Sequence, residues 1–223
     1  MTTKEDYPLL RFFAEQALQG SEHLPSLQEV AQLMGWSMTR VREELAVAKA
    51  LGVVEAKPRV GLRHLPYRFA PAAWLSLKYA LMVDQQKYFG QFADLRRRVE
   101  AAYFHDAAKL LTEEDKHHLQ QLVASAWDKL HRQPPLIPHE EHRELHLTIY
   151  KRLDNTFVNG LLEAYWNAYE IVGLSRYSSF EYLSEVWEYH SRIVEGIVSG
   201  DYDAAYQALI EHTKLLANRP VTG

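Results

Sequence analysis

The spacing of apolar side chains divides the chain into a short N-terminal part and a longer helical part. In the first part, three short stretches with helical periodicity precede a segment punctuated by glycine and proline. In the second part, long helical patterns follow one another with brief breaks and without the alternation typical of strands. These patterns predict helices at about residues 77–109, 113–132, 139–153, 156–174, 179–198 and 201–217.

Two of the short N-terminal helices have the pattern of a helix-turn-helix motif. Ser26 can cap a helix over residues 27–34, Gly35 suits the sharp turn that follows, and Ser37 can cap the next helix. The apolar side chains of that next helix share one face, which we expect to pack inward. Its remaining faces carry Thr39, Arg40 and Arg42.

A helix of this kind can lie in the major groove of DNA, with its N-terminal residues at base edges and phosphates. The segments 52–55 and 62–65 bracket a turn that holds Arg59 and Gly61, which fits a two-stranded wing with a cation at its tip. The alternative interpretation is a small helical domain whose arginines are merely solvated.

The pattern as a whole predicts a mainly α protein with two domains. Residues 1–70 are expected to form a winged helix-turn-helix, and residues 77–217 an antiparallel all-α helical bundle. The two prolines in residues 66–71 mark the expected linker, because each of them interrupts a helix.

Composition and charge refine this picture. With 223 residues, 47% hydrophobic and 24% charged, the chain is typical of a soluble globular protein. Its start lacks the features of a secretory signal, and no uncharged apolar run approaches the length of a membrane span, so we expect a cytoplasmic protein without a membrane partner.

The net charge of −4 conceals an uneven distribution. Residues 36–70 contain seven Lys and Arg against three acidic residues, a balance of +4, so the remainder of the chain sums to −8. A basic segment that coincides with the predicted winged helix-turn-helix favours a nucleic-acid partner.

Four of the 11 histidines fall on apolar helix faces. His142 and His146 are four residues apart on one predicted helix, and His190 and His212 each continue the apolar stripe of a later helix. A single histidine in such a position is usually a core residue with a protein partner. Burying four is costly unless each finds a partner, and one divalent cation would satisfy them together.

Imidazole nitrogens suit divalent transition metals, and the absence of cysteine removes thiolate sites. We therefore expect a metal at these four histidines, with Zn or Ni preferred. Arg96 also lies on an inward face, with Phe92, Val99 and Tyr103. A buried guanidinium needs an acceptor, which is either a ligand carboxylate or an internal acid such as Glu100.

The segment from Leu24 to Gly61 resembles the winged helix-turn-helix of GntR-type bacterial transcriptional regulators. The matching positions are Leu24-Pro25-Ser26, Gly35, Ser37, Thr39, Val41-Arg42-Glu43, Leu45, Gly52-Val53-Val54-Glu55, Pro58-Arg59 and Gly61. The resemblance implies that Arg42 reads bases and that Ser37, Thr39, Arg40 and Arg59 mostly contact phosphate. It also adds Ser26 and Gly61 to the DNA-binding surface.

Residues 77–217 resemble the helical ligand-binding domain of the FadR subfamily of these regulators. In its metal-binding branch, an Asp-x-x-x-His pair is followed by single histidines on two later helices, and His146, His190 and His212 match three of these ligands. His142 stands where that branch has aspartate. The resemblance implies that Arg96 lies at an effector cavity, where it helps to hold a small carboxylate.

Together, these features predict a homodimeric regulator rather than an enzyme, with no catalytic residues. We expect it to bind a palindromic operator in double-stranded DNA and to dimerise and bind its effector through residues 77–217. One alternative is the same regulator with a degenerate metal site. Another is a helical-bundle metalloenzyme, which is disfavoured because we expect no inward carboxylate and find no HExxH, GxSxG or P-loop motif.

Overall fold

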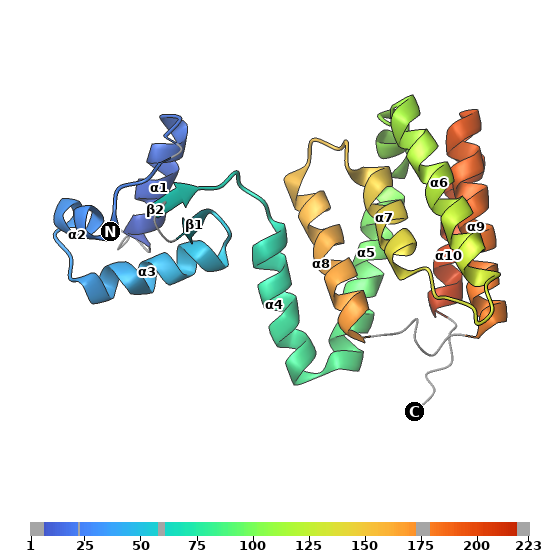
Figure 1. Cartoon of the computed structure of the whole chain (residues 1–223), viewed down its shortest axis with the longest axis horizontal. Helices are drawn as coiled ribbons and strands as arrows, with labels where there is room; N and C mark the ends of the chain where they lie inside the picture. Colours follow the sequence, from blue (N-terminus) through green and yellow to red (C-terminus); the bar gives the residue numbers. More distant parts are fainter. Residues whose placement is uncertain (1–6, 22, 58–60, 173–178, 218–223) are drawn as a thin grey trace. The chain divides into compact units, whose positions relative to one another are not determined.

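The structure is a computed structural model that describes residues 7–21, 23–57, 61–172 and 179–217 (Figure 1). It consists of two compact units, Met1–Ser76 and Leu77–Gly223. In the described ranges, ten helices and one two-stranded sheet make up the regular structure, so the predicted mainly α fold class is confirmed.

The first unit contains three helices followed by a β-hairpin. Apolar side chains from all five elements form its core, with Leu9, Phe13, Val30 and Val41 almost fully buried. The elements are α1 (Pro8–Leu18), α2 (Leu27–Met34), α3 (Met38–Ala50), β1 (Val54–Lys57) and β2 (Gly61–His64).

Local interactions define the ends of α2 and α3. The Ser26 hydroxyl accepts a hydrogen bond from the backbone N–H of Glu29, and the Glu29 carboxylate accepts one from the N–H of Ser26. Gly35 ends α2 with a φ of 65°, a left-handed conformation that glycine adopts without strain. Ser37 then caps α3 by accepting from the N–H of Arg40.

The hairpin has the strand arrangement of the predicted wing. Strands β1 and β2 are antiparallel, with Val54 opposite His64 and Lys57 opposite Gly61. Strand β1 begins two residues later than the predicted segment 52–55, and β2 begins one residue earlier than the predicted segment 62–65. Arg59, at the expected wing tip, lies outside the described residues.

The helix predicted at 77–109 was wrong, because the structure has two helices there. Helix α4 (Ala70–Val83) ends before Asp84, whose extended backbone and side chain begin α5 (Gln85–Lys109). The Asp84 carboxylate accepts a hydrogen bond from the N–H of Lys87. The linker is also shorter than the predicted residues 66–71, because Pro71 already lies in the first turn of α4. Proline is tolerated there, since the N–H that it lacks would have no partner within the helix.

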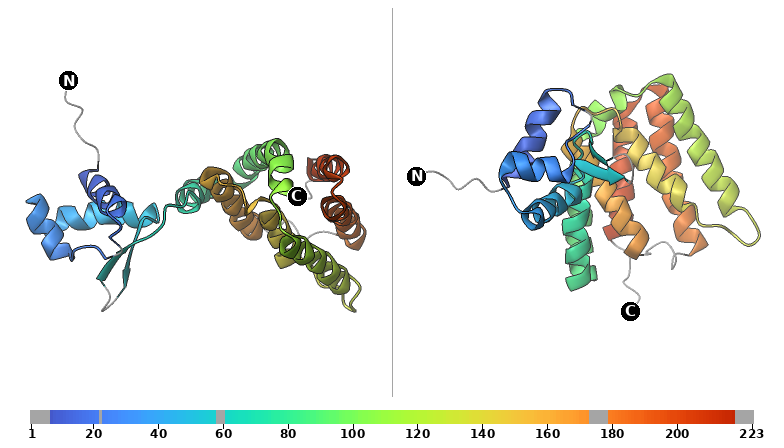
Figure 2. Two further views of the ribbon diagram at one scale, coloured as in Figure 1. Left: turned by 90° about the horizontal axis from the view of Figure 1, so that it is seen from above. Right: turned by 60° about the vertical axis from the view of Figure 1, so that its left-hand side comes forward.

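The second unit is a bundle of long helices (Figure 2). After α5 come α6 (Glu113–Leu130), α7 (His139–Tyr150), α8 (Thr156–Val172), α9 (Phe180–Ser199) and α10 (Tyr202–Ala217). Helix α5 packs against α7, α8 and α10, while α9 packs against α6 and α10. Between α9 and α10 the chain turns on Gly200 and Asp201, so these helices are antiparallel neighbours.

In the parts of the chain that the structure describes, no helix combines the length and apolar character that crossing a membrane requires.

The contact between α9 and α10 depends on a glycine. A Cβ atom placed on Gly196 would lie 2.8 Å from the Ala205 Cβ and 2.9 Å from the backbone nitrogen of Ala205. We predict that Gly196→Ala lowers the free energy of unfolding by about 1–3 kcal/mol, because the two backbones must separate. The measurement is urea denaturation followed by circular dichroism.

Gly90, in α5, is the matched control. It is exposed, and a Cβ there meets nothing within 4 Å. Gly90→Ala should therefore raise the free energy of unfolding by about 0.5–1 kcal/mol through helix propensity alone. Equal effects of the two substitutions would contradict the proposed close packing at Gly196.

Candidate functional site

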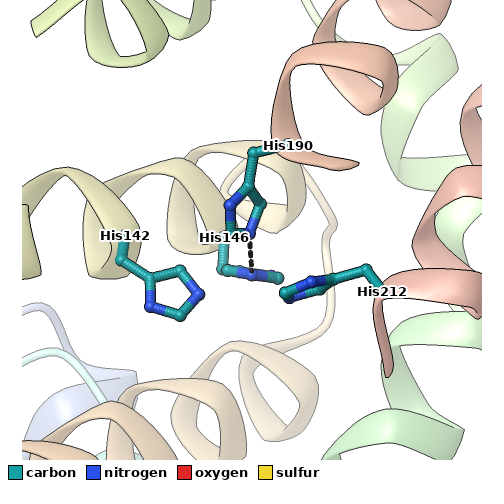
Figure 3. Close-up of side chains that lie close together, drawn as sticks. All are labelled: His142, His146, His190 and His212. Carbon is teal, nitrogen blue, oxygen red and sulfur yellow. Dashed lines mark hydrogen bonds between the residues drawn. The ribbon is translucent and has the colours of Figure 1, made fainter. Parts of the chain in front are cut away.

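The structure brings the four inward histidines together inside the helical unit (Figure 3). His142 and His146 come from α7, His190 from α9 and His212 from α10. One ring nitrogen from each residue lies within 4.8 Å of the corresponding nitrogens of the other three. His142 is 8% exposed and the other three are fully buried.

Several of these ring nitrogens lack a hydrogen-bond partner. Within the cluster, Nε2 of His146 lies 3.1 Å from Nε2 of His190, the interaction drawn as a dashed line in Figure 3. Among the described residues, no partner is found for four buried nitrogens: Nε2 of His142, Nδ1 of His190, and Nδ1 and Nε2 of His212. Unpaired buried polar atoms are rare in folded proteins, and an ordered water molecule or an ion commonly satisfies them.

Burial also determines the protonation state of the cluster. It lowers the pKa of all four histidines well below the ordinary value, since the charged imidazolium would lose its hydration. The neighbouring histidines and Arg96 lower the pKa of His190 further. The imidazoles are therefore neutral at pH 7, the state in which a ring nitrogen can bind a metal.

The donor set fits a divalent transition metal. In tetrahedral coordination with bonds of about 2.1 Å, two ligand nitrogens lie about 3.4 Å apart. The limit of 4.8 Å within the cluster exceeds this by about 1.4 Å, so the rings must move closer together to bind one ion. Four neutral imidazoles suit Zn and Ni, whereas Mg and Mn prefer oxygen ligands.

Arg96 forms an internal ion pair beside this cluster. Its Nε lies 2.8 Å from Oε2 of Glu100, and both side chains are buried. The expectation that no carboxylate would point inward was therefore wrong. The sequence left two acceptors open for Arg96, a ligand carboxylate and an internal acid. The structure contains the internal acid, Glu100. Glu100 could have been identified as inward, because it follows Arg96 by one helical turn on the same face of α5.

Arg96 and Glu100 both contact the same nitrogen of His146. Nδ1 lies 2.8 Å from an Arg96 terminal nitrogen and 3.2 Å from Oε1 of Glu100. Arg96 can donate only to an unprotonated Nδ1, whereas Glu100 can accept only from a protonated one. The Glu100 interaction leaves the lone pair on Nε2, the form of the ring that can bind a metal through this atom. Nε2 lies 3.1 Å from Nε2 of His190 and 3.2 Å from the same Arg96 nitrogen.

Aromatic side chains enclose the cluster, and the sequence interpretation did not identify them. The ring of His142 lies 4.7 Å from that of Trp166 and 6.2 Å from that of Trp187, measured between centroids. Both tryptophans are almost fully buried. The apolar environment they create explains why burial dominates the histidine pKa shifts.

The residues expected to contact DNA lie in the first unit. Ser26, Ser37, Thr39, Arg40, Arg42 and Gly61 are all exposed, and Arg59 lies outside the described residues. Arg40 lies over the ring of Trp36, 3.9 Å from its centroid, and its Nε is 3.4 Å from Glu44. These contacts hold its guanidinium against α3 without burying it.

The histidine pKa shifts predict a pH-dependent stability for the metal-free protein. Each histidine has a lower pKa when folded than its unfolded value of about 6.5, so unfolding takes up protons below that pH. The free energy of unfolding should therefore fall as pH decreases from 6.5, by up to about 1.4 kcal/mol per pH unit for each histidine.

Urea denaturation at pH 7.5, 6.5 and 5.5 in the presence of a chelator measures this slope. His190→Gln keeps a polar side chain of similar length but removes one titrating group, so its slope should be smaller. Identical slopes for both proteins would contradict the assignment of the pH dependence to the cluster.

Comparisons with known proteins identify the family. Residues 91–215, more than half of the chain, match the FCD domain. The chain is 28% identical over 214 residues to the HTH-type transcriptional regulator YieP of Escherichia coli K12, covering 91% of this chain and 89% of that protein.

In fold the chain is similar to GntR of Streptococcus agalactiae, with a TM-score of 0.68, 19% identity and coverage of 93% and 94% of the two chains. E. coli McbR/YncC is also similar, with a TM-score of 0.52, 16% identity and coverage of 88% and 85%. The chain therefore belongs to the GntR family of transcriptional regulators, with a FadR-type FCD domain as its C-terminal part.

Proposed function

We propose that this regulator binds a palindromic operator as a homodimer and that a metal-containing effector site in its helical domain modulates this binding. GntR-family regulators bind DNA operators and are typically dimeric. Because the relatives are regulators rather than enzymes, the helical-bundle metalloenzyme is set aside. The observation that carries the metal proposal is the buried four-histidine cluster, in which ring nitrogens lack partners.

In this proposal, α3 is the recognition helix. Its exposed N-terminal half carries Arg42, which we assign to base contacts, and Arg40, which we assign to phosphate. Ser26, Ser37, Thr39, Arg59 and Gly61 complete the DNA-binding surface. A dimer presents two such helices, and two related half-sites in the DNA give a palindromic operator.

The metal would be held by His142, His146, His190 and His212, with Zn or Ni as the preferred ion. When bound, the ion supplies two positive charges and a Lewis-acidic position for an oxygen ligand. The protein leaves that charge uncompensated, because the imidazoles are neutral and Glu100 is balanced by Arg96. An anionic effector, such as a small carboxylate, would therefore be attracted to the site.

Arg96 contributes to the proposed effector site from behind His146. Its terminal nitrogen contacts the His146 ring, and the same guanidinium is paired with Glu100. Its role is to hold the His146 ring in place through this contact while an effector carboxylate binds at the ion. An effector modulates operator binding only if it has different affinities for the DNA-bound and free states.

A degenerate metal site is the competing candidate. The contact between Nε2 of His146 and Nε2 of His190 favours it, since one hydrogen bond uses two ring nitrogens without a metal. Metal analysis distinguishes the two candidates.

The DNA-binding proposal predicts that Arg40 and Arg42 provide affinity. The double variant Arg40→Ala/Arg42→Ala should bind the operator at least about tenfold more weakly, and each lost phosphate contact should reduce the salt slope of log K by about 1. Fluorescence anisotropy at several salt concentrations measures both. Arg132→Ala is a control, because this arginine is exposed in the helical unit. Full operator affinity in the double variant would contradict the proposal.

The metal proposal predicts about one Zn or Ni ion per chain in protein purified without a tag. His190→Ala should lower metal content and affinity at least about tenfold, because three ligands remain. Elemental analysis and competition with a chelating dye measure this. His117→Ala is the matched control, since His117 is exposed on α6. Metal-free wild-type protein that binds no added Zn or Ni would favour the degenerate site.

A further inference from the structure

Two side chains of the first unit hold the arginine at the start of α3. The guanidinium carbon of Arg40 lies 3.9 Å from the centroid of the Trp36 ring. Its Nε lies 3.4 Å from Oε1 of Glu44, one helical turn further along α3. The three residues follow one another at intervals of four, which places them in a row on one side of the helix.

Both ends of this row are anchored in the unit. The Trp36 side chain is half-buried and packs against the apolar core, and the N–H of Trp36 donates to the Ala31 carbonyl. Oε2 of Glu44 accepts a hydrogen bond of 3.0 Å from the backbone N–H of Leu9, at the start of α1. Because both of its neighbours are fixed by other contacts, Arg40 is restricted to few side-chain conformations.

The outer edge of the Arg40 guanidinium is available for a ligand. The side chain is 50% exposed, and no described residue forms a hydrogen bond or ion pair with its two terminal nitrogens. An arginine can donate from both of these nitrogens to one phosphate group, whose oxygens match their spacing. Arg40 also lies in the first turn of α3, where the helix dipole favours an anion.

We propose that Trp36 is a positioning residue, whose ring holds Arg40 in the orientation in which both terminal nitrogens bind one DNA phosphate. This inference rests on the proposed function, in which Arg40 contacts phosphate. A mobile arginine side chain loses rotational freedom when it binds, which lowers affinity by up to about tenfold. Stacking on Trp36 imposes this order before DNA binds, so the ring contributes to affinity without contacting DNA itself.

Two substitutions of Trp36 distinguish stacking from packing. Trp36→Phe keeps an aromatic face, whereas Trp36→Leu keeps an apolar side chain without a ring. Trp36→Leu should bind a DNA duplex selected in vitro with the wild-type protein about fivefold more weakly, and Trp36→Phe should stay within about twofold of wild type. Fluorescence anisotropy measures the affinities, and urea denaturation compares the stabilities. Equal losses of affinity in the two variants, or no loss in either, would overturn the inference.

Arg40→Lys tests the two-point contact without altering the core. Lysine keeps the charge but cannot donate to a phosphate from two fixed nitrogens. This variant should bind the same duplex about fivefold more weakly, with an unchanged salt slope because the charge remains. Wild-type affinity in Arg40→Lys would be incompatible with the proposed contact.

A double-mutant cycle tests whether Trp36 acts through Arg40. In an Arg40→Ala background, Trp36→Leu should cause no further loss of affinity. In an Arg42→Ala background it should still cause the loss of about fivefold, because Arg42 is exposed on the same helix but does not stack on Trp36. Additive losses for Trp36→Leu and Arg40→Ala would overturn the positioning role.

Arg40→Ala alone separates this inference from the function on which it rests. Weaker binding by Arg40→Ala, combined with an additive effect of Trp36→Leu, preserves the phosphate contact and overturns only the role of Trp36. Full affinity of Arg40→Ala for the selected duplex contradicts both.

Discussion

The burial of four imidazoles at one point is the constraint on which the helical unit depends. Helices α7, α9 and α10 each present histidine to the interior, at positions where an apolar side chain would pack without losing hydrogen bonds. The described protein atoms replace only some of those bonds. A single metal ion can satisfy all four rings, so the arrangement that is expected to make the metal-free fold sensitive to acid is also a potential binding site. In the proposed function, stability and ligand binding would be linked through the same nitrogen atoms.

The charge balance around the cluster determines what it can attract. An aspartate in place of His142 would cancel one charge of a bound divalent ion, whereas the imidazole cancels none. Glu100 does not take over this role, because Arg96 balances it at 2.8 Å. Burial raises the pKa of Glu100, an effect that Arg96 opposes, so the carboxylate depends on its partner to remain charged. The proposed site would therefore be a positive ion whose charge no protein carboxylate cancels, which suits an anionic ligand.

The two units differ in how much of their structure follows from neighbouring residues. In the first unit, Ser26 with Glu29, the left-handed Gly35 and the cap at Ser37 are interactions within three or four residues, so the sequence could predict α2 and α3. The break at Asp84 was missed because helix-forming residues continue on both sides of it. The inward direction of the histidines and of Arg96 was predicted from helical periodicity. The distances between these side chains could not be predicted, because they depend on how far each helix is rotated and shifted against the others.

The sequence by itself therefore determined the family, the mainly α fold class, the helix-turn-helix and the apolar faces on which the four histidines lie. Periodicity and capping are local properties of the chain, which is why they can be read without coordinates. Only the tertiary structure decided that nitrogens from α7, α9 and α10 lie within 4.8 Å of one another. It also selected Glu100 as the partner of Arg96. These features join residues far apart in the chain, and helix packing alone brings them together.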